Sequence, residues 1–203
     1  MSQKKKTQFA ILGLLSWKPM SGYDIKKIVD VGLSHFWNEN YGQIYPTLDE
    51  LVNVGFAKKS VDKNSGKRKR YVYRITPDGA SAFHEWHAQP ADVPTVRNEL
   101  QLKFFLGSKL PAQNSLRIIR EYQIQQRAIL REYRESEVEL RKAIKSGDYP
   151  DEVLEILEGH EKPQTAKQKA KQCRIFLLTL RHGILALEAR MKWCDEVINE
   201  LSA

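Results

Sequence analysis

A dense run of basic side chains in the first half of the chain is the feature best suited to chemistry. Between residues 58 and 74 the single acid is Asp62, and the bases are Lys58, Lys59, Lys63, Lys67, Arg68, Lys69, Arg70 and Arg74. Such a cluster attracts a polyanion, because each Lys or Arg can neutralise a phosphate and release its counterion. From charge alone, a solvated basic hairpin explains the same residues equally well.

The sequence lacks the residue patterns of common enzyme sites. His84-Glu85-Trp86-His87 has the residue types of a zinc-protease helix, but its histidines are three apart, whereas two histidines sharing one zinc on a helix need a spacing of four. We find no glycine-flanked serine, phosphate-binding loop or dinucleotide fingerprint. Cys173 and Cys194 fall in a hydrophobic pattern, where burial disfavours the reactive thiolate. We therefore expect no enzyme activity, metal site or cofactor, and a surface or packing role for the histidines.

The composition is typical of a soluble globular protein. The 203 residues are 41% hydrophobic and 29% charged, and the formal net charge of +8 lies mostly in the first 90 residues. No segment is apolar for long enough to cross a bilayer, and two cysteines are too few for a disulfide framework. These features predict a cytoplasmic protein with no membrane partner.

The elements that must position the basic cluster follow a recognisable order. Three helices are expected: one over residues 7–16, one that begins at Ser21, and one over about residues 41–53. Ser21 and Asp24 have the spacing of a capping box at the start of the second helix. Residues 56–61 and 70–75 then predict a hairpin, and Thr76-Pro77-Asp78 has the residue types that begin another helix. This order predicts a winged helix-turn-helix, which we assign to residues 1–89, in a mainly α fold with a small β-hairpin.

The helix expected over residues 41–53 has two different faces. Ile44, Leu48 and Leu51 recur at helical spacing and predict a buried stripe. In a winged helix-turn-helix, the N-terminal end of this recognition helix enters the major groove, where a glutamine can form two hydrogen bonds with adenine. We therefore predict contacts with double-stranded DNA from the residues near this end, namely Tyr41, Gly42, Gln43, Pro46 and Thr47. Phosphate contacts are predicted from the wing residues Lys67, Arg68, Lys69 and Arg70.

Residues 95–203 are expected to form a second, helical domain after a linker that contains Pro90 and Pro94. The last helix has apolar residues alternately four and three positions apart, typical of a coiled-coil seam. The seam consists of Cys173, Leu177, Leu180, Ile184, Leu187, Met191, Cys194, Ile198 and Leu201. Either a second copy or the preceding long helix of the same chain could cover it. We favour a homodimer through this seam, because Ile175, Leu178 and Leu185 add apolar surface outside it.

Several short motifs occur in order between residues 8 and 88. They are Ala10-Ile11-Leu12-Gly13-Leu14-Leu15, Ser21-Gly22-Tyr23-Asp24-Ile25, Phe36-Trp37, Gln43-Ile44-Tyr45-Pro46-Thr47-Leu48, Arg70-Tyr71-Val72-Tyr73 and Thr76-Pro77-Asp78-Gly79. This set resembles the PadR family of transcriptional regulators. Pro94-Thr95-Val96-Arg97-Asn98-Glu99 is similar to the start of the C-terminal domain in the branch that includes a phenolic-acid repressor and a virulence activator.

This resemblance implies a homodimer that binds an inverted-repeat operator, usually as a repressor, and is sometimes released by a small aromatic ligand. It also implies roles at DNA for Tyr23, Gln43, Tyr45 and the wing. A nonspecific DNA-binding architectural protein, or an adaptor without a ligand response, is the alternative function. The two differ in selectivity, because a regulator should prefer its operator by a large factor at physiological salt.

Aromatic residues concentrate around the second and third expected helices. A site for a flat organic molecule needs such walls, although aromatic residues at these spacings are more often ordinary core. We interpret the cluster as a candidate effector pocket. Its members are Trp17, His35, Phe36, Trp37 and Tyr41, with Trp86 and Phe104 as neighbours across the domain junction.

Overall fold

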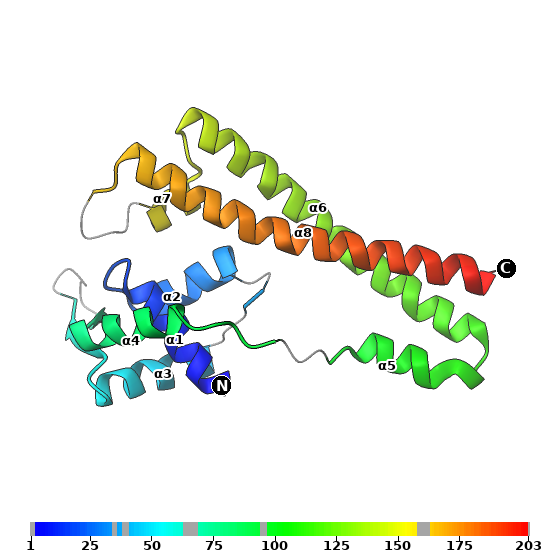
Figure 1. The fold of residues 1–203 in the computed structure, drawn as a ribbon, viewed down its shortest axis with the longest axis horizontal. Coiled ribbons are helices and arrows are strands. Elements are labelled where there is room, and N and C mark those ends of the chain that lie inside the picture. The colour runs from blue at the N-terminus through cyan, green and yellow to red at the C-terminus, as the bar shows by residue number, and fades with distance from the viewer. Residues whose placement is uncertain are drawn as a thin grey trace. The chain divides into compact units, whose positions relative to one another are not determined.

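The computed structural model describes residues 3–33, 36–37, 41–62, 69–93, 97–157 and 163–202. These residues are mostly helical, with one antiparallel hairpin (Figure 1). Contacts divide the chain into two units, Met1–Val93 with Asp151–Lys169 and Pro94–Pro150 with Ala170–Ala203. Asp151–Lys169 belongs to the N-terminal unit, whereas the sequence pattern assigned all of residues 95–203 to one helical domain. Within the described ranges, no helix has the length and hydropathy to cross a membrane.

The first three helices lie close to their predicted positions. They are α1 (Gln3–Leu15), α2 (Gly22–Ile28), which runs into a π-helical turn η1 (Val29–Leu33), and α3 (Tyr41–Asn53). Ser21 caps α2 as its spacing predicted, because its backbone N–H donates to Asp24 Oδ2 at 2.9 Å and its hydroxyl accepts from the Asp24 N–H at 3.3 Å. Pro46 lies inside α3, further from its start than the first turn.

The predicted hairpin follows α3. Strands β1 (Ala57–Val61) and β2 (Tyr71–Ile75) are antiparallel, with Ala57 opposite Ile75 and Val61 opposite Tyr71. Tyr73 is buried, and its backbone exchanges two hydrogen bonds with Met20, which ties the hairpin to the α1–α2 turn. Tyr71 is exposed, so the face of β2 that Tyr71 shares with Tyr73 is buried at Tyr73 and open towards Tyr71.

Helix α4 (Pro77–His87) completes the winged helix-turn-helix and begins as predicted. The Thr76 hydroxyl accepts from the Gly79 N–H at 3.1 Å, and Pro77 occupies the first turn. Gly79 permits a close approach, because a Cβ built there would lie 2.2 Å from the carbonyl oxygen of Phe56. The core of this unit includes the predicted α3 stripe, since Ile44, Leu48 and Leu51 are all fully buried.

The second unit contains α5 (Glu99–Leu106), a 3₁₀ turn η2 (Gly107–Lys109), α6 (Ala112–Ser146) and most of α8 (Ala166–Ser202). The N-cap of α5 is Asn98, whose side chain accepts from the Gln101 N–H at 3.1 Å. Helix α6 ends at Gly147, whose φ of 78° is the left-handed conformation that glycine favours. The short α7 (Asp151–Leu157) belongs to the first unit.

From Leu180 onward, the apolar seam of α8 is covered by α6 of the same chain. Leu180, Ile184, Leu187 and Met191 form one core cluster with Leu130 of α6, and Ile129, Tyr133 and Leu140 pack against it. A second cluster joins Cys194 and Val197 to Ile119 of α6, with Leu100, Phe104, Ile198 and Leu201 at its edge. Burial raises the pKa of both cysteine thiols. The intrachain alternative therefore accounts for the seam, and its role between two copies stays a prediction.

Candidate nucleic-acid interface and aromatic pocket

The N-terminal half of α3 presents an exposed surface. Gly42, Gln43 and Pro46 are exposed, as predicted for an end that enters a groove. Thr47 is an exception, because it is buried with only 5% of its surface exposed. Thr47 lies three residues after Ile44 and four before Leu51, so it falls on the buried side of the helix. Thr47 therefore does not lie on the exposed face of α3, and its contact with DNA stays a prediction.

Two tyrosines adjoin this surface. Tyr23, at the start of α2, is 61% exposed, and Tyr45 of α3 is 43% exposed. The Tyr45 ring lies directly against Gly22, where an added Cβ would meet the ring at 2.6 Å. The glycine thus lets the Tyr45 ring lie beside the start of α2. The sequence motifs containing Tyr23 and Tyr45 are brought together by this contact.

Arg70 joins the wing to α2. Its guanidinium donates to Asp24 Oδ2 at 2.6 Å and to the Ser21 hydroxyl at 3.2 Å. Partial burial opposes ionisation of Asp24, but hydrogen bonds from Ser21 and Arg70, with the charge of Arg70, hold the pKa of this carboxyl below its usual value. Arg70 was predicted to contact phosphate. In the structure, the Arg70 guanidinium forms an ion pair with the Asp24 carboxylate.

Lys59 is a residue that the sequence did not single out within the basic cluster. Its amino group lies 3.2 Å from Asp49 Oδ1 of α3 and over the rings of Tyr71 and Tyr73, 4.8 Å and 5.5 Å from their centroids. Hydrogen bonds with Tyr73 and Asp49 raise the pKa of Lys59. Lys59 therefore links the wing to α3, a role that depends on hairpin register and could not be found from charge alone.

The tip of the wing lies outside the described residues, and with it Lys67 and Arg68. Lys69 is described and exposed, as are Lys58 and Arg74 on the strands. Tyr41 begins α3, but its side chain is not described.

A cavity of about 290 Å³ brings together four of the predicted effector residues. Its aromatic walls include Trp17, Phe36, Trp37 and Trp86, together with Phe9 and Phe83, which the sequence analysis missed. The rings of Phe9 and Trp86 are stacked with centroids 5.1 Å apart. Phe9 lies within the helix expected over residues 7–16, and helical spacing by itself gives no sign that its ring borders a cavity.

One basic side chain lines the described part of this cavity. Lys6 Nζ lies 3.1 Å from Asp92 Oδ2, and Lys6 holds the pKa of Asp92 below its usual value. Phe104 is not among the lining residues, because it lies in the second unit with its ring edge-on to Trp193. His35 lies outside the described residues. His84 and His87 are exposed on α4 beside Phe83, which fits the surface role expected for them.

Two family models together match most of the chain. Residues 11–85 match the model described as the transcriptional regulator PadR-like family, and residues 96–202 match the virulence activator alpha C-terminal model. The negative transcriptional regulator PadR of Bacillus subtilis is 33% identical over 121 residues, which cover 59% of this chain and 66% of that relative.

Solved structures support the same fold over nearly the full length. Bacillus subtilis PadR in complex with operator DNA matches with a TM-score of 0.75 at 23% identity, covering 96% of each chain. The same protein in complex with p-coumaric acid matches with a TM-score of 0.69 at 22% identity, over 97% of this chain and 98% of that one. The virulence activator AphA of Vibrio cholerae gives a TM-score of 0.72 at 28% identity, over 97% and 98%.

These matches agree with the winged helix, the exposed recognition helix and the long C-terminal helices. They place the chain among transcriptional regulators and not among enzymes. The chain belongs to the PadR-like family of transcriptional regulators.

Proposed function

We propose that this chain is a sequence-specific repressor that binds an inverted-repeat operator as a homodimer in the cytoplasm. The observation that carries the proposal is the exposed N-terminal end of α3, where Gly42, Gln43 and Pro46 lie opposite a fully buried stripe. Such an end fits a major groove, because its backbone and short side chains allow close approach. The relative solved with operator DNA has the same fold.

Each exposed group has a distinct role in this proposal. Gln43 addresses a base edge, and Tyr23 and Tyr45 donate hydroxyl hydrogen bonds to phosphates on either side of it. Lys69 and the residues at the wing tip contact the backbone electrostatically. Arg70 holds the wing against α2 through Asp24, so it orients the other contacts.

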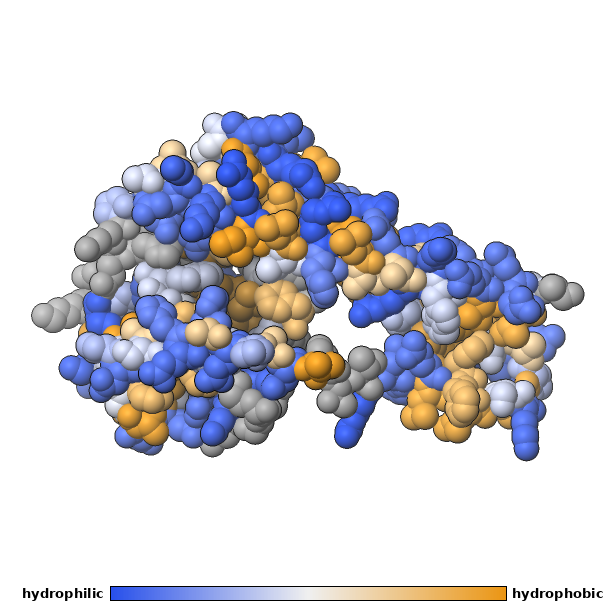
Figure 2. All heavy atoms as spheres, viewed as in Figure 1, coloured by the Kyte–Doolittle hydropathy of each residue, from blue (hydrophilic) through white to orange (hydrophobic). Residues whose placement is uncertain are grey.

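The homodimer contact is assigned to apolar side chains that lie outside the seam and stay exposed in the single chain. On α8, Ile175, Leu178 and Leu185 are 52%, 67% and 54% exposed. On α5 and the turn after it, the exposed residues are Leu102, Phe105, Leu106 and Leu110. Figure 2 shows hydrophobic residues gathered over α5. A second copy is the occupant that fits, because an inverted-repeat operator requires two recognition helices related by a two-fold axis.

The aromatic pocket is assigned to a small aromatic effector. Its walls of Trp17, Phe36, Trp37 and Trp86 suit a flat ring, and its volume of about 290 Å³ suits one small molecule. The relative solved with p-coumaric acid shows that one member of the fold binds such a ligand. Binding here lowers operator affinity if the ligand prefers the arrangement that cannot bind DNA.

A selection of bound fragments from random DNA tests the DNA-binding part. We expect one enriched inverted repeat, and Gln43→Ala should relax preference at one position per half-site, costing about 1 to 3 kcal/mol there. Gln113→Ala, an exposed glutamine on α6, is the matched control and should leave the preference unchanged. Equal affinity for all sequences would instead identify a nonspecific DNA-binding protein.

The effector part is tested by titrating p-coumarate against tryptophan fluorescence and operator release. We expect both signals to respond in the wild type and in Trp37→Phe, which keeps an aromatic wall, and to weaken in Trp37→Ala. If Trp37→Ala responds like the wild type, or if millimolar p-coumarate changes neither signal, the pocket assignment is wrong.

A further inference from the structure

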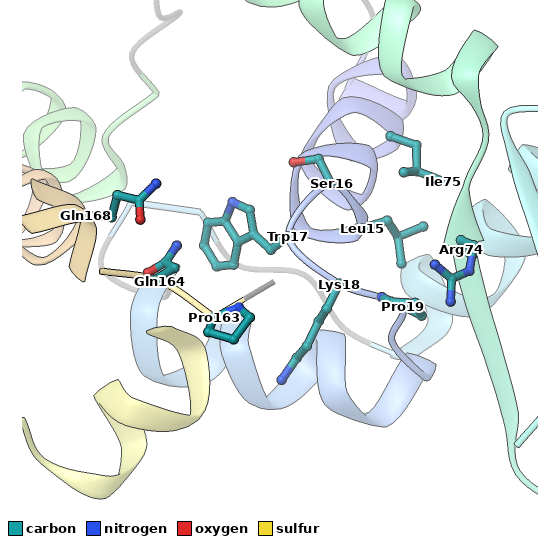
Figure 3. A pocket seen from close by; sticks show the side chains of 10 residues that line it. All are labelled: Leu15, Ser16, Trp17, Lys18, Pro19, Arg74, Ile75, Pro163, Gln164 and Gln168. Atoms are coloured by element: carbon teal, nitrogen blue, oxygen red, sulfur yellow. The ribbon is translucent and has the colours of Figure 1, made fainter. Parts of the chain in front are cut away.

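Two neighbouring lysines of strand β1 lie in different surroundings. In the hairpin register, Lys58 lies opposite Arg74, and Lys59 lies opposite Tyr73. Because successive side chains of a strand point to opposite faces, the two lysines lie on opposite sides of the hairpin. On the side of Lys58, Arg74 lines a cavity beside Pro19 of the α1–α2 turn (Figure 3). Lys59 lies on the other side, so its charge has different neighbours.

The amino group of Lys59 is held by α3 and by the wing together. Lys59 Nζ lies 3.2 Å from Asp49 Oδ1 of α3 and 4.8 Å and 5.5 Å from the ring centroids of Tyr71 and Tyr73 on β2. The two rings attract the ammonium group through their π faces, and the carboxylate attracts it through its charge. The Lys59 side chain is 35% exposed, whereas that of Asp49 is 59% exposed. The acid is therefore the more open member of this pair.

Asp49 lies on the surface of α3 that the proposed function turns towards DNA. It follows Tyr45 by four residues and Pro46 by three, so the three exposed residues share a helical face that points away from the buried stripe. A carboxylate on this face repels phosphates, because bringing like charges together costs free energy. The ammonium group of Lys59 beside it offsets that repulsion.

We propose that Lys59 is a positioning residue of the DNA interface, which acts through Asp49 and not on a phosphate. Lys59 neutralises the Asp49 carboxylate on the exposed face of α3, and the same contact holds strand β1 of the wing against that helix. This role rests on the proposed function, because it matters only where this face meets DNA. It separates Lys59 from Lys69, which the proposed function assigns to the DNA backbone.

A double-mutant cycle of operator affinity tests this role. Lys59→Met keeps an aliphatic side chain beside the tyrosine rings but leaves Asp49 without its cation, so operator affinity should fall about fivefold. Adding Asp49→Asn removes the carboxylate charge, and affinity should return to within about twofold of the wild type. A direct phosphate contact predicts no recovery, because the second substitution cannot replace a lost contact. Affinity in the double variant no higher than in Lys59→Met would therefore overturn the proposal.

Lys58→Met is the matched control, because it removes the same charge from the other side of the same strand. In Lys58→Met and in the wild type, Asp49→Asn should change operator affinity by less than about twofold, since Lys59 is present in both. An equal gain from Asp49→Asn in all three backgrounds would show that only net charge matters, and it would overturn the pairing.

Urea unfolding without DNA distinguishes positioning from a purely structural role. The unfolding midpoint should be the same in Lys59→Met with and without Asp49→Asn, although the two differ in operator affinity. If the midpoint instead fell and recovered in parallel with affinity, Lys59 would serve the stability of the fold alone, and the proposal would be overturned.

Each affinity is measured on the enriched operator and on a scrambled duplex of the same length. A wild type that binds both duplexes equally would count against the proposed function, but the cycle could still be completed on either duplex. Loss in Lys59→Met followed by recovery with Asp49→Asn would then still support the role of Lys59. Loss without recovery would overturn that role, whether or not the operator is preferred.

Discussion

Helices α3 and α8 each bury one regular row of apolar side chains, but the remainder of their surfaces differs. In α3 the exposed residues near the start are Gly42, Gln43 and Pro46. In α8 the residues outside the covered seam include the exposed Ile175, Leu178 and Leu185. A regular row of apolar residues shows only that one side of a helix is buried. The residues on the exposed side indicate whether that side suits a polar partner such as DNA, as in α3, or an apolar protein surface, as in α8.

The largest expected effect distinguishes the buried seam of α8 from its exposed apolar residues by the change in the free energy of unfolding. Leu187 is 4% exposed in the α6–α8 core, so Leu187→Ala should lower the free energy of unfolding by about 2 to 5 kcal/mol. Leu178 is 67% exposed, so Leu178→Ala should change it by less than about 0.5 kcal/mol while weakening dimerisation. Urea unfolding and sedimentation measure the two effects. If Leu187→Ala were as stable as the wild type but monomeric, the seam itself would form the dimer contact.

A smaller effect should test how α2 shapes the exposed end of α3. Gly22→Ala places a Cβ 2.6 Å from the Tyr45 ring, which must then move. We expect operator affinity to fall about tenfold, which corresponds to about 1.4 kcal/mol, with a smaller change in stability. Gel-shift titration measures the affinity. Gly107→Ala is the control, because its nearest contact is 3.8 Å away, and equal losses in both variants would contradict the Tyr45 role.

The smallest effect concerns the ion pair that fixes the wing. The pKa of Asp24 is lowered from 3.8, so its ionised form stabilises the fold at pH values above about 4. Asp24→Asn should therefore cost about 0.5 to 1 kcal/mol at pH 7, a modest value because the pair is partly exposed.

As the pH falls through the lowered folded pKa, the wild type loses this advantage. Unfolding measured across pH 2 to 7 should show the curves of the wild type and Asp24→Asn converging at the acid end. A difference that does not narrow as the pH falls would mean that the Asn side chain disturbs α2 for another reason.

Local patterns in the sequence were enough to predict much of the first unit. Ser21 with Asp24 and Thr76 with Pro77 mark helix starts through hydrogen bonds that span three residues, so short spacing contains the information. The buried α3 stripe was predicted for the same reason. Thr47 is buried next to this stripe, as its spacing of three from Ile44 and four from Leu51 indicates, although it was grouped with the exposed residues near the start of the helix.

The sequence by itself determined the family motifs, the helix and strand types, and the positive charge of the wing. Only the tertiary structure decided which surface covers the α8 seam, since α6 and a second copy would satisfy the same apolar spacing. It also assigned Arg70 to Asp24 and brought Phe9 and Phe83 to the same cavity as Trp37. These contacts join residues distant in sequence, and their partners are selected by packing and register, which no local pattern encodes.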